Sequence, residues 1–420
     1  MNILLRSARI IDKNSRYHNQ SKDILIQNGI IVTIGKNIEL PKNCKEIKLN
    51  NLHVSNGWFD SSVSFGEPGY EERENIVHGL EVAAKSGFTK IALNPNTNPL
   101  IDNKSAVEFL IQKSTESPVG LYPIANLTQK AEGKELAELY DMQNSGAIAF
   151  GDYNKSVDNV NLLKIALLYA QNFEGMVMSF PQDGSIGTHG FVNESENTTR
   201  LGLSSIPNLS EELQVSRDLA VLEYTGGKLH IPTISTSKSV QLIKDAKKKG
   251  LDVTCSVSAH HMYLTDAEIK SFDTNYKVSP PLRSEKDVKS MIRGVNDGTI
   301  DMIVSDHNPI DIENKNVEFE KGFNGTIGLE SLFGSIRKRL ELEEAISCLT
   351  ENPCKRFNLP VSVIEKDQKA DITLFDPDLE YVFTKEHILS KSKNSAFLGK
   401  GLKGKAYGIY ANQKLILADS

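Results

Sequence analysis

The sequence lacks the features of secreted, membrane-spanning or disulfide-stabilised proteins: it has few cysteines, no long apolar stretch and no signal-peptide pattern. Its 420 residues hold four cysteines, which show neither Cys-x-x-Cys spacing nor the density of a disulfide scaffold. No stretch approaches the roughly 20 apolar residues of a membrane span, and the first residues turn polar too soon for a signal peptide. We therefore expect reduced, packed thiols in a cytoplasmic protein that enters no membrane.

An excess of positive charge is missing as well. The formal net charge is -6, on 24% charged residues. Without a broad basic field, nucleic acid is not expected as a partner. The chain is long enough for one large domain with an appendage or for two domains, and either can bury a substantial core.

Short β-branched and leucine-rich runs, separated by turn signals, occupy both ends of the chain. They fall at Ile3–Ile11, Asp23–Gln27, Gly29–Gly35, Glu46–Leu49 and His53–Val54, and again at Ala370–Phe375, Gly404–Tyr410 and Gln413–Leu417. The pattern predicts one small β domain formed by residues 1–55 and 365–420.

Between these ends, short apolar runs alternate with longer amphipathic segments, which is typical of repeated βα units. The expected strands are Gly57–Val63, Phe88–Leu93, Val119–Ile124, Ala147–Phe150, Gly175–Met178, Lys228–Ile231, Asp252–Val257 and Thr299–Val304. A helix over Ser239–Lys249 should end at Gly250. Eight such units predict an α/β protein with a (β/α)8 TIM-like barrel over residues 56–364, with an interrupted doubly wound sheet as the weaker alternative.

Functional side chains of such barrels lie at the C-terminal ends of the strands. The segment after the first strand reads Asp60-Ser61-Ser62-Val63-Ser64-Phe65-Gly66-Glu67-Pro68-Gly69. The other strand ends carry residues 94–97, Asp152, residues 179–180, 232–233, 258–261 and 305–307.

Taken in order, these motifs resemble dihydroorotase over nearly the full length of the chain. The similarity is to the cyclic amidohydrolases, in the bacterial branch that works with aspartate transcarbamoylase. It rests on Glu67-Pro68-Gly69, residues 94–97, 201–203, 235–236, 260–261, 279–285, 297–301, 306–307, 328–330, 352–353, 370–371 and 390–394. In this family the first strand ends in Asp-x-His-x-His, where period-2 geometry points both imidazoles at one zinc ion.

The resemblance implies six metal-binding positions, and every histidine among them is replaced here. The positions are Ser62, Ser64, Asp152, Phe180, Thr233 and Asp306. Carboxylates with hydroxyls make at most a weak site for hard cations, so we expect no metal cofactor, with zinc only if the site has been rebuilt. Asp306, a ligand and general base in the family, is the one residual catalytic residue.

The resemblance also implies that the substrate's carboxylate has lost most of its anchors. The family's arginine falls on Gly66, its histidine on Ile310, and the asparagine before Pro-Pro-Leu-Arg on Ser279. Loss of a bidentate guanidinium removes the strongest such anchor. Only Asn96 remains as a residual substrate-binding residue.

Structural roles compete with functional ones at several of these positions. Neighbouring Asp306 and His307 should face opposite ways, which leaves one of them structural. His260 and His261 are interpreted as a hydrogen-bonded pair at the barrel rim. Asp152 could serve only to orient that rim, and an emptied site would hold Asp152 and Asp306 close together.

Three functions remain open from the sequence alone. The favoured hypothesis is a catalytically inactive dihydroorotase-like protein of pyrimidine biosynthesis that is a structural or regulatory partner of aspartate transcarbamoylase. The alternative is an active dihydroorotase or related cyclic amide hydrolase with a rebuilt site. A third is a module that binds another small ligand in the altered pocket. A homo- or hetero-oligomer is expected.

Overall fold

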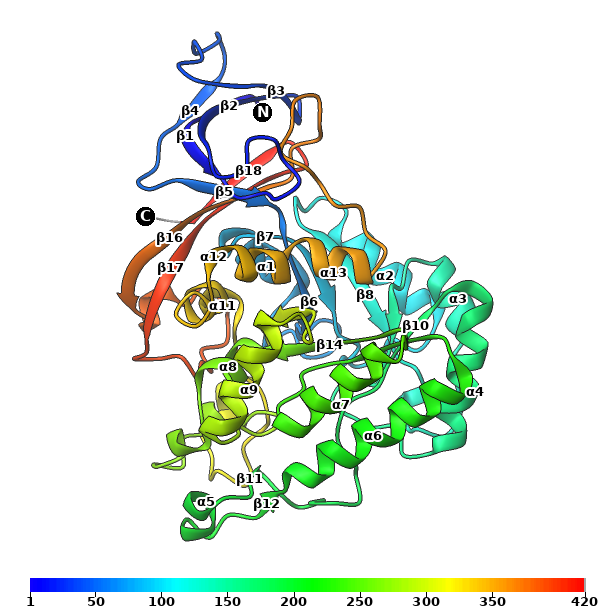
Figure 1. Ribbon diagram of the computed structural model, residues 1–420. Coiled ribbons are helices and arrows are strands. Elements are labelled where there is room, and N and C mark those ends of the chain that lie inside the picture. The colour runs from blue at the N-terminus through cyan, green and yellow to red at the C-terminus, as the bar shows by residue number, and fades with distance from the viewer. Residues whose placement is uncertain (419–420) are drawn as a thin grey trace.

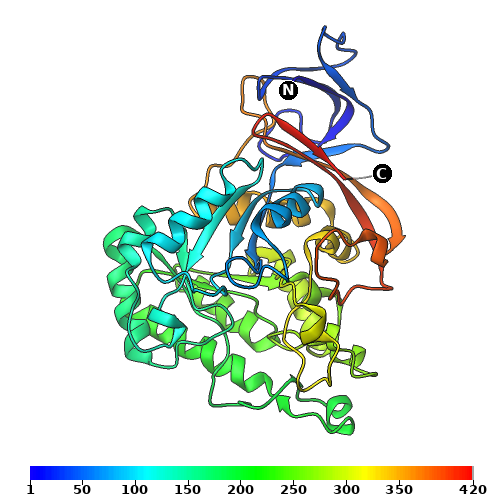
Figure 2. The same ribbon diagram turned by 180° about the vertical axis from the view of Figure 1, so that it is seen from behind.

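In the computed structural model, which describes residues 1–418, a barrel of parallel strands lies beside a separate β-sheet (Figures 1 and 2). The barrel strands are β6 (Trp58–Val63), β7 (Phe88–Leu93), β8 (Gly120–Ala125), β9 (Ala149–Phe150), β10 (Met176–Met178), β13 (Lys228–Ile231), β14 (Val253–Ser258) and β15 (Met302–Val304). Each pairs with the next in chain order. The first and last strands meet at a parallel bridge between Val63 and His307, where the Ser64 N–H donates to the His307 carbonyl at 2.6 Å. The predicted barrel is confirmed.

Helices cover the outside of the barrel. The longer ones are α1 (Ile76–Lys85), α2 (Lys104–Ser114), α4 (Val160–Ala170), α6 (Asn208–Thr225), α7 (Ser237–Lys248), α9 (Glu285–Asn296), α11 (Leu329–Ile336) and α12 (Leu342–Leu349). Shorter ones are α3 (Leu139–Asn144), α5 (Glu196–Arg200), α8 (Ala259–Tyr263), α10 (Ile312–Lys315) and α13 (Glu351–Arg356), with a two-stranded ribbon of β11 (Val192–Asn193) and β12 (Ser205–Ile206). Within residues 1–418 no helix has the length and apolar character needed to cross a membrane.

Local signals explain where several helices begin and end. Asn75 and Asn159 cap α1 and α4 by accepting backbone N–H bonds through their side chains. After α7, Gly250 takes the left-handed conformation at φ +82°, as the sequence predicted. The barrel interior is filled by Phe59, Ala92, Ile124, Ala149, Met176, Met178 and Met302, with Cys354 of α13 and Phe357 directly after it. The barrel interior is therefore a packed core.

The second sheet contains strands from both ends of the chain. Its order is β18 (Lys414–Leu417), β17 (Gly401–Ala411), β16 (Ile372–Val382), β5 (His53–Asn56), β1 (Ile3–Ile10), β2 (Ser21–Gln27) and β3 (Ile30–Gly35), with β4 (Lys45–Ile47) beside β1. The two ends join where β5 pairs antiparallel with β16, and Figure 1 shows the blue β5 beside the orange β16 there. The predicted joining of the termini in one sheet is confirmed.

Two strands of this sheet are longer than the sequence predicted. The turn-like run Asp376-Pro377-Asp378 lies inside β16, where the register with β17 shifts between Asp376 and Glu380. The Asp376 carboxylate accepts N–H bonds from Asp378 and Leu379, so a local turn is held within the strand. A β-bulge accommodates proline in this way without ending the strand.

A buried ion pair joins the barrel to this sheet. Lys90 on β7, only 8% exposed, donates to Asp371 immediately before β16. Burial opposes ionisation of Asp371, but the Lys90 ammonium holds the pKa of its carboxyl below the usual value. Gly57 lies against the same pair, since a Cβ there would come 2.4 Å from the Asp371 carboxylate and 2.0 Å from the Thr89 hydroxyl. The contact between the barrel and the sheet is therefore closely packed as well as charged.

Candidate functional site

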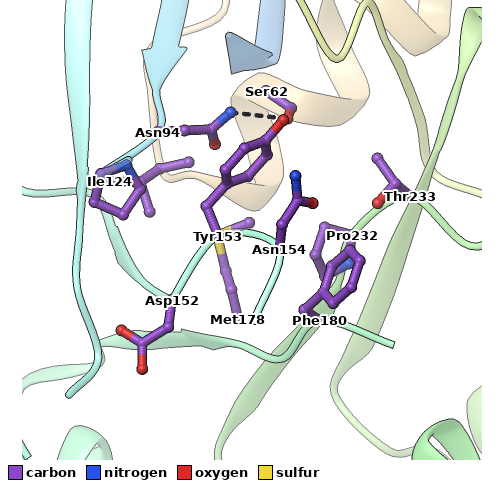
Figure 3. A pocket seen from close by; sticks show the side chains of 12 residues that line it. Ser62, Asn94, Ile124, Asp152, Tyr153, Asn154, Met178, Phe180, Pro232 and Thr233 are labelled. Carbon is purple, nitrogen blue, oxygen red and sulfur yellow. Dashed lines mark hydrogen bonds between the residues drawn. The ribbon is translucent and has the colours of Figure 1, made fainter. Parts of the chain in front are cut away.

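A small cavity lies at the C-terminal ends of the barrel strands (Figure 3). Its lining comes from six strand ends and the loops after them, and consists of Ser62, Asn94, Pro95, Ile124, Gly151, Asp152, Tyr153, Asn154, Met178, Phe180, Pro232 and Thr233. Four of the six predicted metal positions are in this set. The cavity volume is ≈ 20 Å³, which is room for about one water molecule. Phe180, 6% exposed, is part of its wall.

A hydrogen-bonded network closes the mouth around Asp306. Tyr153 donates its hydroxyl to the Asp306 carboxylate at 2.9 Å, and Ser62 donates to the same oxygen at 3.3 Å. The Asn94 amide donates to the hydroxyls of Ser62 and Ser64, at 3.2 Å each. The amide thus bridges the two serines at the positions that the resemblance assigned to metal-binding histidines.

The carboxyl of Asp306 is buried with no cation among its hydrogen-bond partners in the described chain. Burial raises its pKa to about 6, while the bonds from Tyr153 and Ser62 act in the opposite direction. Asp60, fully buried on β6, has a pKa of about 7, chiefly because of burial and in part because of the Asp306 charge. These two are the electrostatically coupled carboxyls beneath the mouth.

Asp152 lines the cavity but turns its carboxylate away from Tyr153 (Figure 3). Its oxygens accept from the Leu127 and Thr128 backbone at 3.0 and 3.2 Å, from the Asn126 amide at 3.3 Å, and from the Thr128 hydroxyl. The expected pairing of Asp152 with Asp306 is therefore not the one formed. Asp152 orients the segment after β8, which is the structural role considered for it.

The histidines near the rim are buried and serve the fold. His307 accepts N–H bonds at Nδ1 from Gly328 and Leu329, at 3.1 and 3.4 Å. His261 bonds the Ser258 hydroxyl at 2.6 Å and the Pro280 carbonyl at 3.0 Å. The prediction of a satisfied pair holds for His261 alone, because neither ring nitrogen of His260 has a hydrogen-bond partner in the described chain.

The backbone has closed over the position of the missing arginine. A Cβ on Gly66 would lie 1.7 Å from the carbonyl oxygen of Tyr70, far inside van der Waals contact. Gly66 itself donates to the Glu74 carbonyl at 2.8 Å, and the Tyr70 N–H returns a bond to Gly66 at 2.9 Å. The segment from 66 to 74 therefore has no room for any side chain at this residue.

The other substrate-binding positions do not meet at the mouth cavity. Ile310, 3% exposed, lines a separate hollow of ≈ 880 Å³ formed by residues 273–275, 310–316 and 391–394 among others. Asn96 is absent from the mouth lining, and its buried Oδ1 has no partner within residues 1–418. Asn94, two residues earlier, contacts the serines instead.

The donor set does not fit a zinc ion. Zinc sites in proteins use imidazole, thiolate and carboxylate ligands, but the mouth presents hydroxyls, an amide and one carboxylate. Nowhere in the described part of the chain do three His, Cys, Asp or Glu side chains gather in a group that could hold a metal. What the arrangement offers chemically at the mouth is the Asp306 carboxylate, whose pKa burial raises to about 6.

Sequence reasoning from the family's positions missed Tyr153, Asn94 and Asp60. Tyr153 follows Asp152 directly, and Asp60 is the first residue of the Asp-x-His-x-His frame. Each of the three lies within two residues of a family position, namely Asp152, Asn96 and Ser62, and this was the available signal. Position alone does not tell which of two neighbours turns inward.

Comparison with known proteins identifies the family of the chain. Residues 53–239 match the family profile described as "Dihydro-orotase-like". A dihydroorotase from Syntrophus aciditrophicus is 38% identical over 412 residues, which cover 96% of each chain. The chain belongs to the dihydroorotase family. Another dihydroorotase, from Acetivibrio thermocellus, is 37% identical over 99% of each chain.

The fold of this dihydroorotase-family chain is also found among solved structures. The L-hydantoinase from Arthrobacter aurescens superposes with a TM-score of 0.84, covering 99% of this chain and 96% of the other at 20% identity. A D-hydantoinase gives a TM-score of 0.82. At this identity the likeness concerns the barrel and the terminal sheet alone.

Proposed function

We propose that this member of the dihydroorotase family does not hydrolyse dihydroorotate and acts as a structural or regulatory partner of aspartate transcarbamoylase. The observation that carries the proposal is the closed network at the barrel mouth, where Tyr153, Ser62 and Asn94 occupy the space around Asp306. A cavity of ≈ 20 Å³ lies far below the several hundred Å³ of an ordinary ligand pocket. A folded barrel with such a mouth is better suited to binding another protein through its outer surface than to binding a substrate at the mouth.

Two features of the site speak against the family's reaction. Water with no activating metal keeps a pKa near 15.7, so Asp306 would have to deprotonate it without help from a cation. The closed segment over Gly66 leaves no place for a guanidinium that could hold a substrate carboxylate.

One observation favours the alternative of a rebuilt, metal-free hydrolase. Asp306 has a pKa of about 6, and a general base works best with a pKa near the working pH. Tyr153, whose pKa burial and Asp306 raise well above the ordinary value, would be a protonated donor beside it. Tyr153 would have to swing out before any substrate could enter.

The purified protein should contain far less than one zinc per chain, because three hydroxyls and the Phe180 ring stand where the family has histidine ligands. Plasma mass spectrometry after expression in zinc-supplemented medium measures this directly. As a positive control, the variant with Ser62, Ser64, Phe180 and Thr233 all changed to histidine should gain zinc. Stoichiometric zinc in the unaltered protein, with a fall in stability on chelation, would support the alternative.

Hydrolysis of dihydroorotate, followed by its ultraviolet absorbance, should not exceed the rate of the buffer blank. Both activation of water and anchoring of the carboxylate are impaired, and these supply most of what a hydrolase requires. The matched control is Asp306→Ala, which should give the same rate. Turnover in the unaltered chain that disappears in Asp306→Ala would show that the rebuilt site works.

Aspartate transcarbamoylase from the same organism should co-elute with this chain when the two are co-expressed. Binding to the folded state stabilises by mass action, by roughly 2.7 kcal/mol at a partner concentration of 100 times Kd. The transcarbamoylase should therefore melt at a higher temperature in the mixture. Separate elution at micromolar concentration, with unchanged size, activity and melting, would remove this partner and favour the pocket-binding function.

A further inference from the structure

The hollow of ≈ 880 Å³ that Ile310 lines shares no residue with the mouth cavity, and we call it the loop hollow. Its walls include residues 273–275 from the loop after β14, residues 310–316 after β15, and residues 391–394 from the segment between β16 and β17. Ligand sites of this fold lie in the loops that follow the barrel strands. The volume falls within the roughly 300–1,000 Å³ of small-molecule sites.

Side-chain hydrogen bonds hold the walls of the loop hollow together. Asn394, 4% exposed, accepts the Ile310 N–H at 3.1 Å and donates to the Gly325 carbonyl at 3.2 Å. Asp311 caps α10 by accepting the Asn314 N–H at 2.9 Å. Walls that are already fixed need little ordering when a ligand enters, which favours binding.

Two exposed lysines of the loop hollow keep their positive charge without a carboxylate beside them. Lys391 donates to the Glu71 carbonyl at 2.8 Å, and Lys393 donates to the Ser390 carbonyl at 2.6 Å. Within residues 1–418 all the hydrogen bonds of both ammonium groups go to carbonyl oxygens. A carbonyl oxygen carries no net charge, so the two cations remain available to an anion.

The acidic side chains of the loop hollow are neutralised in part. Four lysines and four acids line it, and Arg73 adds a fifth cation beside two of the acids. The guanidinium of Arg73 lies 3.4 Å from the Asp311 carboxylate and 3.9 Å from that of Glu72. The excess charge around the hollow is therefore positive.

Two buried lysines add to this excess. Lys315, 5% exposed, lines the loop hollow and donates from Nζ to the carbonyls of Thr274 and Phe323 at 2.7 and 2.8 Å. Lys277, 4% exposed, donates from Nζ to the Phe319 carbonyl at 2.9 Å. Two neighbouring buried ammonium groups that only carbonyls accompany are costly, and an anion beside them would reduce that cost.

The pKa values of both amines agree with a missing counter-charge. Burial, and after it the charge of Lys277, lowers the pKa of Lys315 to about 7, although Asp273 acts in the opposite direction. Burial lowers the pKa of Lys277 to about 8, against the effect of Glu320. An anion within reach would raise both pKa values, because it favours the charged amines.

From the size of the loop hollow, its fixed walls and its lysines we infer that it binds a small organic anion with two or more acidic groups. Hydroxyl and amide groups of Thr274, Asn314 and Ser392 also line it and suit further oxygens of such a ligand. The described lining holds no aromatic ring on which a nucleobase could stack, which favours an aliphatic or sugar frame. The inference does not depend on the proposed function, because it concerns the chain by itself.

Isothermal titration calorimetry of the purified chain at pH 8 tests the inference with two probes, fructose 1,6-bisphosphate and propane-1,2,3-tricarboxylate. At least one should bind with a Kd below about 1 mM. The tighter probe identifies phosphate or carboxylate as the recognised group. Neutral fructose is the control ligand and should give no binding heat. If neither anion binds at about 10 mM, the inference is wrong.

Proton uptake distinguishes the loop hollow from any other cationic surface. Titration in two buffers of different ionisation enthalpy should show that binding takes up protons at pH 8, because the anion raises the pKa of Lys315 and Lys277. Phosphate, with a second pKa near 6, is already fully ionised at this pH. Lys315→Arg keeps the charge but does not titrate, so it should bind with a smaller uptake. Binding without proton uptake would place the anion elsewhere and overturn the inference.

The double variant Lys391→Gln/Lys393→Gln removes two exposed charges from the wall and should weaken binding by roughly 10-fold to 100-fold. The matched control is Lys36→Gln/Lys42→Gln, which removes two exposed charges near the terminal sheet and should leave the Kd unchanged. Equal affinities of the two double variants would overturn the site. If the melting curve shows that the first variant does not fold, Lys385→Gln, at another exposed lysine of the hollow, takes its place.

Discussion

Replacement of Lys90 by methionine is expected to lower the free energy of unfolding by about 3–5 kcal/mol. The substitution keeps much of the buried aliphatic stem but leaves the Asp371 carboxylate without its counter-charge between β7 and β16. An uncompensated buried charge is far more costly than a lost surface contact. Urea denaturation followed by circular dichroism measures the loss.

The double variant Lys90→Met/Asp371→Leu separates two contributions to the free energy of unfolding: that of the ion pair itself, and the cost of leaving one buried charge unpaired. It should lose less than Lys90→Met alone, because no unpaired charge remains. Lys248→Met is the surface control, since Lys248 and its partner Asp245 are 66% and 53% exposed and such pairs contribute about 0–1 kcal/mol. Equal losses for Lys90→Met and Lys248→Met would contradict the prediction.

The variant Asp306→Asn should be more stable than the unaltered protein at pH 8, by about 2 kcal/mol, and about equally stable at pH 4. Burial holds the pKa of Asp306 at about 6 in the folded chain, above its usual value near 3.9. A carboxyl with a raised folded pKa favours folding fully below pH 4, and this contribution is lost as the pH rises through 6. Asparagine removes the buried charge, and it tolerates the left-handed φ of +48° at this residue.

Melting temperatures measured between pH 4 and pH 8 show the predicted divergence. Asp245→Asn is the control, because the Gln241 amide and Lys248 lower the pKa of this exposed carboxyl, so its removal brings no gain at pH 8. If Asp306→Asn were instead less stable at pH 8, the charged carboxylate would stabilise the fold, and a bound cation should then be sought by metal analysis. That result would favour the rebuilt hydrolase.

The order and type of the barrel strands could be predicted from sequence because each is a buried apolar run between turn signals. β7 and β13 have the predicted bounds, and the others differ by one to three residues at an end. The predicted strand ended at Phe375, whereas β16 continues to Val382, because Asp376-Pro377-Asp378 has the composition of a turn. Only tertiary pairing with β17 reveals it as a bulge inside a strand.

The site was less predictable than the fold. Family positions correctly brought Ser62, Phe180 and Thr233 to one cavity, because strand ends of a barrel converge. They did not reveal that Asn94 bridges the serines or that Tyr153 reaches Asp306. Those contacts depend on loop conformations and on which of two neighbouring polar residues turns inward.

The closure of the backbone over Gly66 has a consequence for protein engineering. A Gly66→Arg substitution would place Cβ 1.7 Å from the Tyr70 oxygen, so the backbone of residues 66–74 must move before any side chain can be accommodated there. The substitution alone is therefore expected to disrupt this loop without adding a guanidinium that could bind a carboxylate. An attempt to build a carboxylate-binding site at this position should begin with substitutions that open the loop and should add the arginine last.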